Sequence, residues 1–290
     1  MSTPRDVLQS RPELRSQRSF PSFGAVGEKP RSALEKLLSV FADVRAGEGV
    51  TTLLLTVNVF LLLAGYYLLK TARESLILTE GGAAIKSYSA ALQAALLMLV
   101  VPAYGWVAAR VKRVKLVTGV MLFFALHLAV FFVLGRQGVK EGVVFFVWLG
   151  IYNVFVISQV WAFANDLFTE PQGKRLFPFI GVGSSLGAWL GAEAASEVVK
   201  GSDPYSLMAL GVGILLACTA IVFAVDRLEA QRGDKDWTKA GDEPLGKEGG
   251  FQLVLSDKYL RLIALLVILL NIVNSAGEYM LGDIVGSEAI

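Results

Sequence analysis

Residues 50–69 read VTTLLLTVNVFLLLAGYYLL, a stretch without any Asp, Glu, Lys or Arg. The hydrocarbon core of a membrane is about 30 Å thick, and an α-helix needs about 20 apolar residues to cross it. Within hydrocarbon every backbone N–H and C=O must be bonded inside the protein, so a helix is the expected form. This stretch therefore predicts a membrane-spanning helix near the start of the chain.

Further apolar runs follow the first, and together they cover about half of the 290-residue chain. Only the fifth run contains a charged residue, Glu193. The strands of a membrane β-barrel would instead give alternating stretches of about 10 residues. The sequence thus predicts an all-α membrane protein. The predicted spans are residues 50–69, 88–109, 116–134, 143–165, 176–195, 205–225 and 262–277.

The composition agrees with this class and excludes several others. Hydrophobic residues make up 54% of the chain and charged residues 18%, with a mean hydropathy of +0.57, whereas soluble domains carry about 25% charged residues. A soluble enzyme, a disordered chain and a collagen-like repeat are therefore excluded. The net charge of +2 gives no field to attract nucleic acid. The single cysteine, Cys218, excludes a disulfide framework and a cysteine zinc site.

The spacing of the spans divides the chain into four parts. Residues 1–49 are predicted to be a polar cytoplasmic tail, in which residues 32–44 have the spacing of a short helix on the membrane surface; a poorly ordered leader is the alternative. Residues 50–225 hold six spans, 226–258 form a charged cytoplasmic linker, and 259–290 hold the seventh span.

This layout of six spans, a long loop and a renewed span is that of carriers built from two six-helix halves, the major-facilitator-like arrangement. The seventh span would then begin a truncated second half, and the missing helices would be a partner. An intact seven-helix protein is the alternative.

Lys and Arg are distributed unequally between the two sides of the predicted spans. Of the 27 basic residues, 21 fall on the side of residues 1–49 and 6 on the other side. Basic residues collect on the cytoplasmic side of membrane proteins. We therefore expect a multi-pass protein of the cell's inner membrane with its N-terminus in the cytoplasm.

A charged cluster follows the first span directly, in the sequence Lys70-Thr71-Ala72-Arg73-Glu74. Lys70, Arg73 and Glu74 are three and four residues apart, so they share one face if the helix continues, which the apolar residues after them favour. Two cations against one acid are costly in a membrane and usually line a water-filled path. We interpret the cluster as a binding site for an anionic substrate; basic side chains that reach out to lipid headgroups are the alternative.

A second polar set lies in the fourth span and the loop after it. Three amides interrupt the apolar run at intervals of six residues, so they do not share one narrow face. Polar groups in a span normally face a bundle interior, where they contact substrate or bond a neighbouring helix. For the two basic residues that open the fifth span, ordinary cytoplasmic placement is the alternative to a substrate role. The set comprises Asn153, Gln159, Trp161, Asn165, Lys174 and Arg175.

Glycines at four-residue spacing, Gly183, Gly187 and Gly191, predict that the fifth span packs closely on another helix. The single histidine, His127, has no Cys, Asp or Glu nearby, so we expect no metal site but an interhelical hydrogen bond, with proton coupling as the alternative. No phosphate-binding loop and no Ser–His–Asp grouping can be assembled, so neither an enzyme nor a cofactor is expected. Candidates in the seventh span for facing the first half are Asn271, Asn274 and Glu278.

Both polar clusters resemble the ATP:ADP antiporter family, the nucleotide transporters of plastids and intracellular bacteria. Residues 69–79, LKTARESLILT, are similar to the end of that family's first span, with two basic residues three apart, then an acid and an apolar run. The matching residues of the fourth and fifth spans are Trp161, Phe163, Ala164, Asn165, Lys174, Arg175, Phe177, Gly181 and Gly183.

The resemblance implies a major-facilitator-like carrier that exchanges ATP for ADP, or another nucleotide, by alternating access. Charge-assisted hydrogen bonds from Lys70 and Arg73 would suit a polyphosphate. Glu74 would hold these cations in place in the empty site, and Tyr66, Tyr67 or Trp161 would stack on a base.

The chain also departs from the family in places that bear on the substrate. Ala64-Gly65-Tyr66 stands where the family tends to have Phe-Asn-Tyr, and small residues replace an Asn-containing stretch in the fifth span. A carrier of another organic anion or of a lipid is therefore an alternative. A non-transporting scaffold or sensor module, joined to other helices through the glycine face, is a second one.

Overall fold

The computed structural model describes residues 31–108, 110–201, 203–232 and 254–288. These residues form helices and no strand, which confirms the expected all-α fold. The helices are α1 (Ala33–Leu38), α2 (Gly49–Ala108), α3 (Arg113–Arg136), α4 (Gly142–Leu167), α5 (Glu170–Gly201), α6 (Pro204–Arg232) and α9 (Lys258–Glu288).

Six described helical stretches are long and apolar enough to cross a membrane, and they make the chain a multi-pass membrane protein by length and composition. They correspond to every predicted span except the fifth. The six are Gly49–Glu80, Ala84–Ala108, Arg113–Arg136, Gly142–Leu167, Pro204–Gln231 and Lys258–Leu281.

The predicted fifth span lies within α5, which has 32 residues but is not among the six. Its length suffices for a crossing, whereas its many Gly, Ser and Ala residues lower its hydropathy. The same small residues shape its packing, since α5 is the helix that contacts α2 most extensively.

The helix expected over residues 32–44 forms as α1 but ends at Leu38. A reciprocal cap starts it, because the Ser32 hydroxyl accepts the Glu35 N–H at 3.3 Å and the Glu35 carboxylate accepts the Ser32 N–H at 2.7 Å. Beyond the C-cap Ser39, Val40 and Phe41 lie outside the helix with their side chains exposed.

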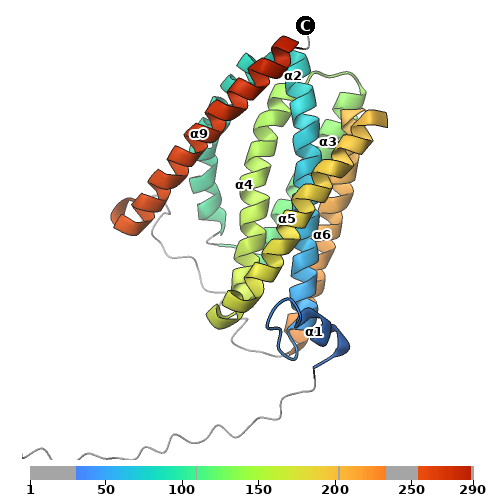
Figure 1. Cartoon of the computed structure of the whole chain (residues 1–290), viewed down its shortest axis with the longest axis vertical. Coiled ribbons are helices and arrows are strands. Elements are labelled where there is room, and N and C mark those ends of the chain that lie inside the picture. Colours follow the sequence, from blue (N-terminus) through green and yellow to red (C-terminus); the bar gives the residue numbers. More distant parts are fainter. Residues whose placement is uncertain (1–30, 109, 202, 233–253, 289–290) are drawn as a thin grey trace, which may run out of the picture.

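Helix α2 is two membrane helices joined by a sharp turn at Gly82, whose φ of 65° and ψ of −168° interrupt the helix. Glycine populates positive φ without the steric cost that a Cβ brings. We call Gly49–Glu80 the first limb and Ala84–Ala108 the second limb. The turn sends the second limb back along the bundle (Figure 1).

The helices run back and forth between two ends of the bundle (Figure 1). The α1 end holds α1 and the connections at residues 110–112 and 168–169, and the kink end holds Gly82 and residues 137–141. The first limb occupies the middle, packed against α4, α5 and α6, while α3 packs against α4 and α6.

Close backbone contact joins α5 to the first limb. A Cβ placed on Gly183 would lie 2.8 Å from the Thr56 carbonyl oxygen, and one on Gly191 would lie 2.6 Å from the Ala64 carbonyl oxygen. A Cβ on Gly187 would overlap the Phe60 carbonyl. Both helices advance by four residues between contacts, so three glycines fit three successive turns of the first limb.

Two of the apolar helices bury little surface within the bundle. No residue in the most apolar part of the second limb or of α9 is buried, whereas the corresponding share of the first limb is 44%. Helix α9 runs obliquely along one side of the bundle, with its start lying apart from the other helices, and it contacts α2 only sparingly (Figure 1). Hydrocarbon is as apolar as these side chains, so such faces are stable against lipid or against further helices.

Candidate functional site

Arg73 is buried at the kink end of the first limb, with 8% of its surface exposed. Its Nε donates to Glu74 Oε1 at 3.1 Å, and its Nη2 pairs with the same oxygen. The other oxygen of Glu74 lies 2.7 Å from Nζ of Lys86, which comes from the second limb. Glu74 therefore bridges two cations across the Gly82 turn.

The guanidinium of Arg73 points toward α4. It lies over the ring of Phe146, 4.4 Å from the ring centroid. A guanidinium is weakly hydrated and stacks well on aromatic faces, so this contact is a favourable one for a partly dehydrated cation. Arg73 thus faces the inside of the bundle rather than the lipid.

Lys70 lies one turn before Arg73 and is half-buried. Its Nζ is 5.8 Å from the centroid of the Tyr67 ring, and it forms no ion pair with the residues that the structure describes. The Tyr67 ring meets Tyr66 edge-on, with centroids 5.5 Å apart. The two tyrosines extend the cluster toward the middle of the membrane.

Helix α9 approaches this cluster with an acidic residue. Tyr66 interacts electrostatically with Arg73, Glu74 and Glu278, which places Glu278 of α9 in the neighbourhood. We define the kink-end cluster as Tyr66, Tyr67, Lys70, Arg73, Glu74, Lys86 and Phe146. It holds three cations around one shared carboxylate, so it carries an excess of positive charge even when Glu278 is included.

The α4 amides do not join the kink-end cluster. Asn153 lies seven residues beyond Phe146, about 10 Å along the helix, and Asn165 lies near the opposite end. Gln159 is buried, and its Oε1 has no partner among the described residues. Asn153 is half-buried and Asn165 is exposed. These side chains therefore line the length of α4 rather than one site.

Asn165 and Lys174 come together at the α1 end, where they line an open hollow of about 580 Å³. Glu170 and Thr169 also line it, together with apolar residues, and Trp161 meets one of these, Phe177, edge-on with ring centroids 5.9 Å apart. Lys174 is 74% exposed and pairs with Glu170 at 2.7 Å. The predicted site residues thus do not form one site: the charged cluster lies at the kink end, Asn165 and Lys174 lie at the α1 end, and the other amides lie between them along α4.

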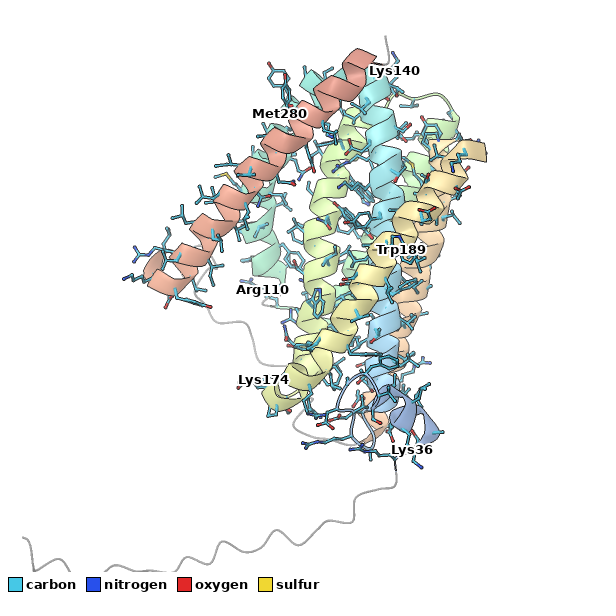
Figure 2. All side chains as sticks on the ribbon, viewed as in Figure 1. Lys36, Arg110, Lys140, Lys174, Trp189 and Met280 are labelled. Atoms are coloured by element: carbon cyan, nitrogen blue, oxygen red, sulfur yellow. The ribbon has the colours of Figure 1, made fainter. Side chains whose placement is uncertain are left out.

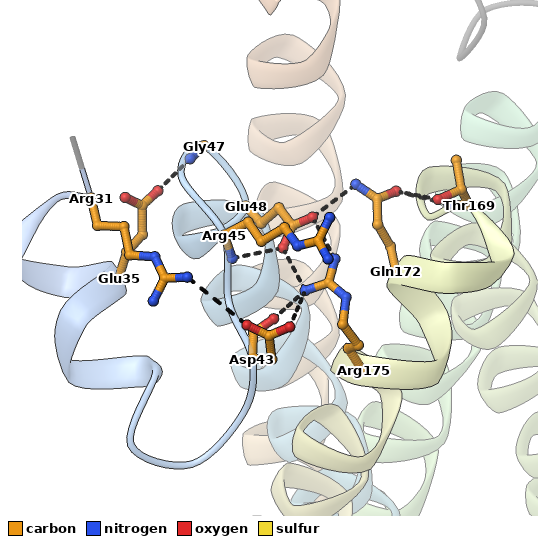
Figure 3. Close-up of polar contacts among 9 residues, drawn as sticks. All are labelled: Arg31, Glu35, Asp43, Arg45, Gly47, Glu48, Thr169, Gln172 and Arg175. Carbon is orange, nitrogen blue, oxygen red and sulfur yellow. Dashed lines mark hydrogen bonds and ion pairs between the residues drawn. The ribbon is translucent and has the colours of Figure 1, made fainter. Parts of the chain in front are cut away.

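Arg175 lies outside this hollow and fastens α5 to the segment that precedes α2 (Figure 3). Its Nη2 lies 3.0 Å from Glu48 Oε1, and its Nη1 donates to the Asp43 carbonyl oxygen and lies 3.8 Å from the Asp43 carboxylate. Gln172 donates to the same Glu48 oxygen at 3.0 Å. The contacts of Arg175 are those of a structural residue.

Burial alone would raise the pKa of Glu48, but hydrogen bonds from Arg175, the Arg45 N–H and Gln172 outweigh burial and hold this pKa below its ordinary value. A carboxyl with a lowered pKa stabilises the fold above its unfolded pKa of 4.5 and loses that contribution as the pH falls. The Glu48–Arg175 pair should therefore weaken in acid.

We expect Arg175→Gln to destabilise the protein by about 1–3 kcal/mol at pH 7, because Glu48 keeps its charge but loses its main partner. The difference in thermal midpoint between pH 7 and pH 4 should shrink in this variant. Thermal unfolding in detergent measures both effects. Lys174→Gln is the matched control, since its exposed ion pair contributes about 1 kcal/mol or less. Equal losses in the two variants would contradict this role for Arg175.

His127 does not make the expected interhelical bond. Its Nδ1 lies 2.8 Å from the carbonyl oxygen of Phe123, four residues earlier in the same helix, so that prediction is wrong. The residues next to it in the sequence are apolar, and its bond goes to a carbonyl of its own helix instead. Among the described residues no group of His, Cys, Asp and Glu could hold a metal ion.

The sequence patterns do not predict two members of the kink-end cluster, Lys86 and Phe146. Lys86 is one of the 6 basic residues on the side of the predicted spans opposite residues 1–49. Phe146 is one of many aromatic residues in an apolar span. The signal for Lys86 was the Gly81-Gly82 pair, which allows a chain reversal between Glu74 and Lys86.

No protein-family model, curated protein or solved structure matches the chain.

Proposed function

We propose that this protein is a membrane carrier that exchanges nucleotides or similar polyanions by alternating access, with the anion bound at the kink-end cluster. The observation that carries the proposal is the buried guanidinium of Arg73, which shares Glu74, its acidic partner among the described residues, with Lys86. Buried charge in a membrane bundle is costly and normally lines a substrate path.

The chemistry of the cluster suits a phosphate group. Arg offers several N–H donors in a planar fork, and Lys70 and Lys86 add flexible point charges nearby. In the empty site Glu74 would hold Arg73 and Lys86 in place, and an entering anion would compete with it for their hydrogen bonds. Tyr66 and Tyr67 would provide faces on which a base stacks. Because Arg73 and Lys86 share Glu74 as a partner, Glu74 can take them back from a bound anion. This competition favours release of the anion, which a carrier requires.

The distribution of basic residues supports an orientation for this carrier. Figure 2 shows Lys36, Arg110 and Lys174 toward the α1 end and Lys140 at the kink end. By the positive-inside rule the α1 end would face the cytoplasm of the inner membrane, and the kink-end cluster would lie toward the opposite side. Alternating access would then have to connect the cluster with the hollow at the α1 end.

The exposed second limb and α9 support a requirement for further helices, as in a carrier with a second half. Asn271, Asn274 and Glu278 are exposed on α9, and one bond among them joins Asn274 to Glu278 at 3.3 Å. Polar groups in an apolar helix normally face protein or water. The same exposed faces favour the second candidate function, a scaffold that assembles with other membrane helices without transport.

Uptake by proteoliposomes that contain the full chain tests the proposal. We expect labelled ATP to enter vesicles loaded with ADP in a saturable way and to enter poorly without internal ADP. A panel of other anionic metabolites, offered as competitors, defines the substrate class. If no anion is taken up and none shifts the thermal midpoint, the carrier function is wrong and the scaffold candidate is favoured.

A further inference from the structure

A carboxylate closes the junction between the first limb and α4. Glu80, the last residue of the first limb, accepts the N–H of Glu141 at 3.0 Å and the N–H of Gly142 at 2.9 Å. These N–H groups open α4, where a helix leaves its first donors unpaired and carries partial positive charge. A Cβ on Gly142 would lie 2.9 Å from the backbone carbonyl oxygen of Leu76, so this close approach of the two helices favours glycine.

The side chain of Glu141 is buried beside this junction without a partner. Only 4% of the residue is exposed, and neither carboxylate oxygen has a hydrogen-bond partner among the described residues. A charged carboxylate in such a position is strongly disfavoured unless it is paired. Glu80 already occupies the N–H groups that would otherwise stabilise a negative charge here.

Among the described residues, no cation pairs with Glu141. Glu80 faces it from the first limb, and Tyr205 of α6 interacts electrostatically with Glu141, Glu80 and Asp203. Arg136 of α3 pairs with Asp203 at 2.5 Å. On the connection itself the neighbouring Lys140 is exposed. Burial and then the negative charge of Glu80 raise the pKa of Glu141 to about 7.

The junction and the kink-end cluster belong to the same pair of helices. Arg73 and Glu80 are seven residues apart on the first limb, about two turns, and Gly142 and Phe146 are four residues apart on α4, about one turn. Arg73 lies over Phe146, and Glu80 bonds to the start of α4. A change in the contact at Glu80 therefore acts directly on the helices that hold the Arg73 guanidinium.

We propose that Glu141 is a proton-binding site that controls this junction. With a proton on its carboxyl group Glu141 is neutral, and the first limb stays docked on α4 through Glu80. When the proton leaves to water, two negative carboxylates face each other in a buried place, and the junction loosens. Coupling of this proton to anion binding at Arg73 rests on the proposed function, whereas the proton site itself does not.

The sign of the pH effect follows from the raised pKa. Below its unfolded pKa of 4.5 the group is neutral in both states, and the fold bears no penalty. As the pH rises through about 7 the folded protein has to accept the buried charge or open the junction. The junction between the first limb and α4 should therefore loosen as the pH rises above about 7.

Infrared difference spectroscopy of the full chain in nanodiscs tests the proton site. We expect the carbonyl band of a protonated carboxyl group to disappear with a midpoint near pH 7 as the pH is raised, and to be missing in Glu141→Gln. Glu197→Gln is the control, because Glu197 is exposed, lies at the same end and pairs with Lys200 at 2.5 Å. A band unchanged in Glu141→Gln would overturn the proposal.

A second variant keeps the test decisive if Glu141→Gln does not fold. Glu80→Gln removes the neighbouring charge, and the midpoint should move to lower pH; an unmoved midpoint would contradict the assignment. ATP binding between pH 5.5 and 8.5 tests the coupling, read as the difference between wild type and Glu141→Gln because phosphate itself titrates near pH 6. We expect affinity to fall through pH 7 in the wild type only. An infrared change without ATP binding at any pH supports the proton site and contradicts the proposed function.

Discussion

Replacing Arg73 by Gln should weaken the binding of ATP or ADP by about 10- to 100-fold. A hydrogen bond to a charged group contributes about 1.5–3 kcal/mol, and 1.4 kcal/mol corresponds to a tenfold change in affinity. Arg73 is the most buried cation of the cluster, at 8% exposure, so its interactions are screened least by water. Equilibrium binding of labelled nucleotide to the protein in nanodiscs measures this change.

Two comparisons make the Arg73 result specific. Lys86→Gln should cost less than Arg73→Gln, because Lys86 is more exposed and offers a single ammonium group. Lys200→Gln removes the same charge at the same end from an exposed ion pair and should leave affinity within about twofold. If Lys200→Gln and Arg73→Gln weaken binding equally, general attraction and not the cluster holds the anion.

Replacing Gly187 by Ala should destabilise the bundle by about 1–3 kcal/mol and lower its thermal midpoint by about 2–12 °C. The added methyl group would overlap the Phe60 carbonyl, which is backbone and cannot rotate away as a side chain could. The first limb and α5 would have to separate, and their contact is the most extensive in the bundle. Unfolding followed by fluorescence or light scattering in detergent measures the shift.

Gly181→Ala is the matched control on the same helix. A Cβ at Gly181 meets nothing within 4 Å, so the better helix propensity of Ala should leave the midpoint equal or slightly raised. A Gly187→Ala protein as stable as Gly181→Ala would show that the two helices do not pack through these glycines.

The membrane helices could be predicted because each span in hydrocarbon must satisfy all of its backbone N–H and C=O groups by itself. A run such as 50–69 must be helical whatever its neighbours are. The charges at 70–74 resemble a membrane boundary, yet the first limb continues to Glu80. Buried Leu76 and Ile77 explain this continuation, because they keep the same face against the bundle.

The site could be predicted only where it lies within one helix. Lys70, Arg73 and Glu74 share a face by spacing alone, and the structure keeps them close together. Lys86 joins them through a chain reversal, and Phe146 through packing of a third element, which no local pattern encodes.

The same limit explains Arg175, whose position after a span resembles that of a substrate ligand. Its partner Glu48 lies 127 residues earlier in the chain, so only the folded structure reveals the pair.

The carrier proposal depends on a wet, positively charged kink-end cluster, and the reactivity of a thiol introduced by Lys70→Cys reports on both properties. Native Cys218 is buried and stays in place. We predict that an anionic water-soluble thiol reagent modifies position 70 faster than a cationic reagent of equal size, because Arg73 and Lys86 attract it. Adding Arg73→Gln should remove this preference. If neither reagent reacts, or if the cationic reagent reacts as fast as the anionic one, the cluster is not an anion site.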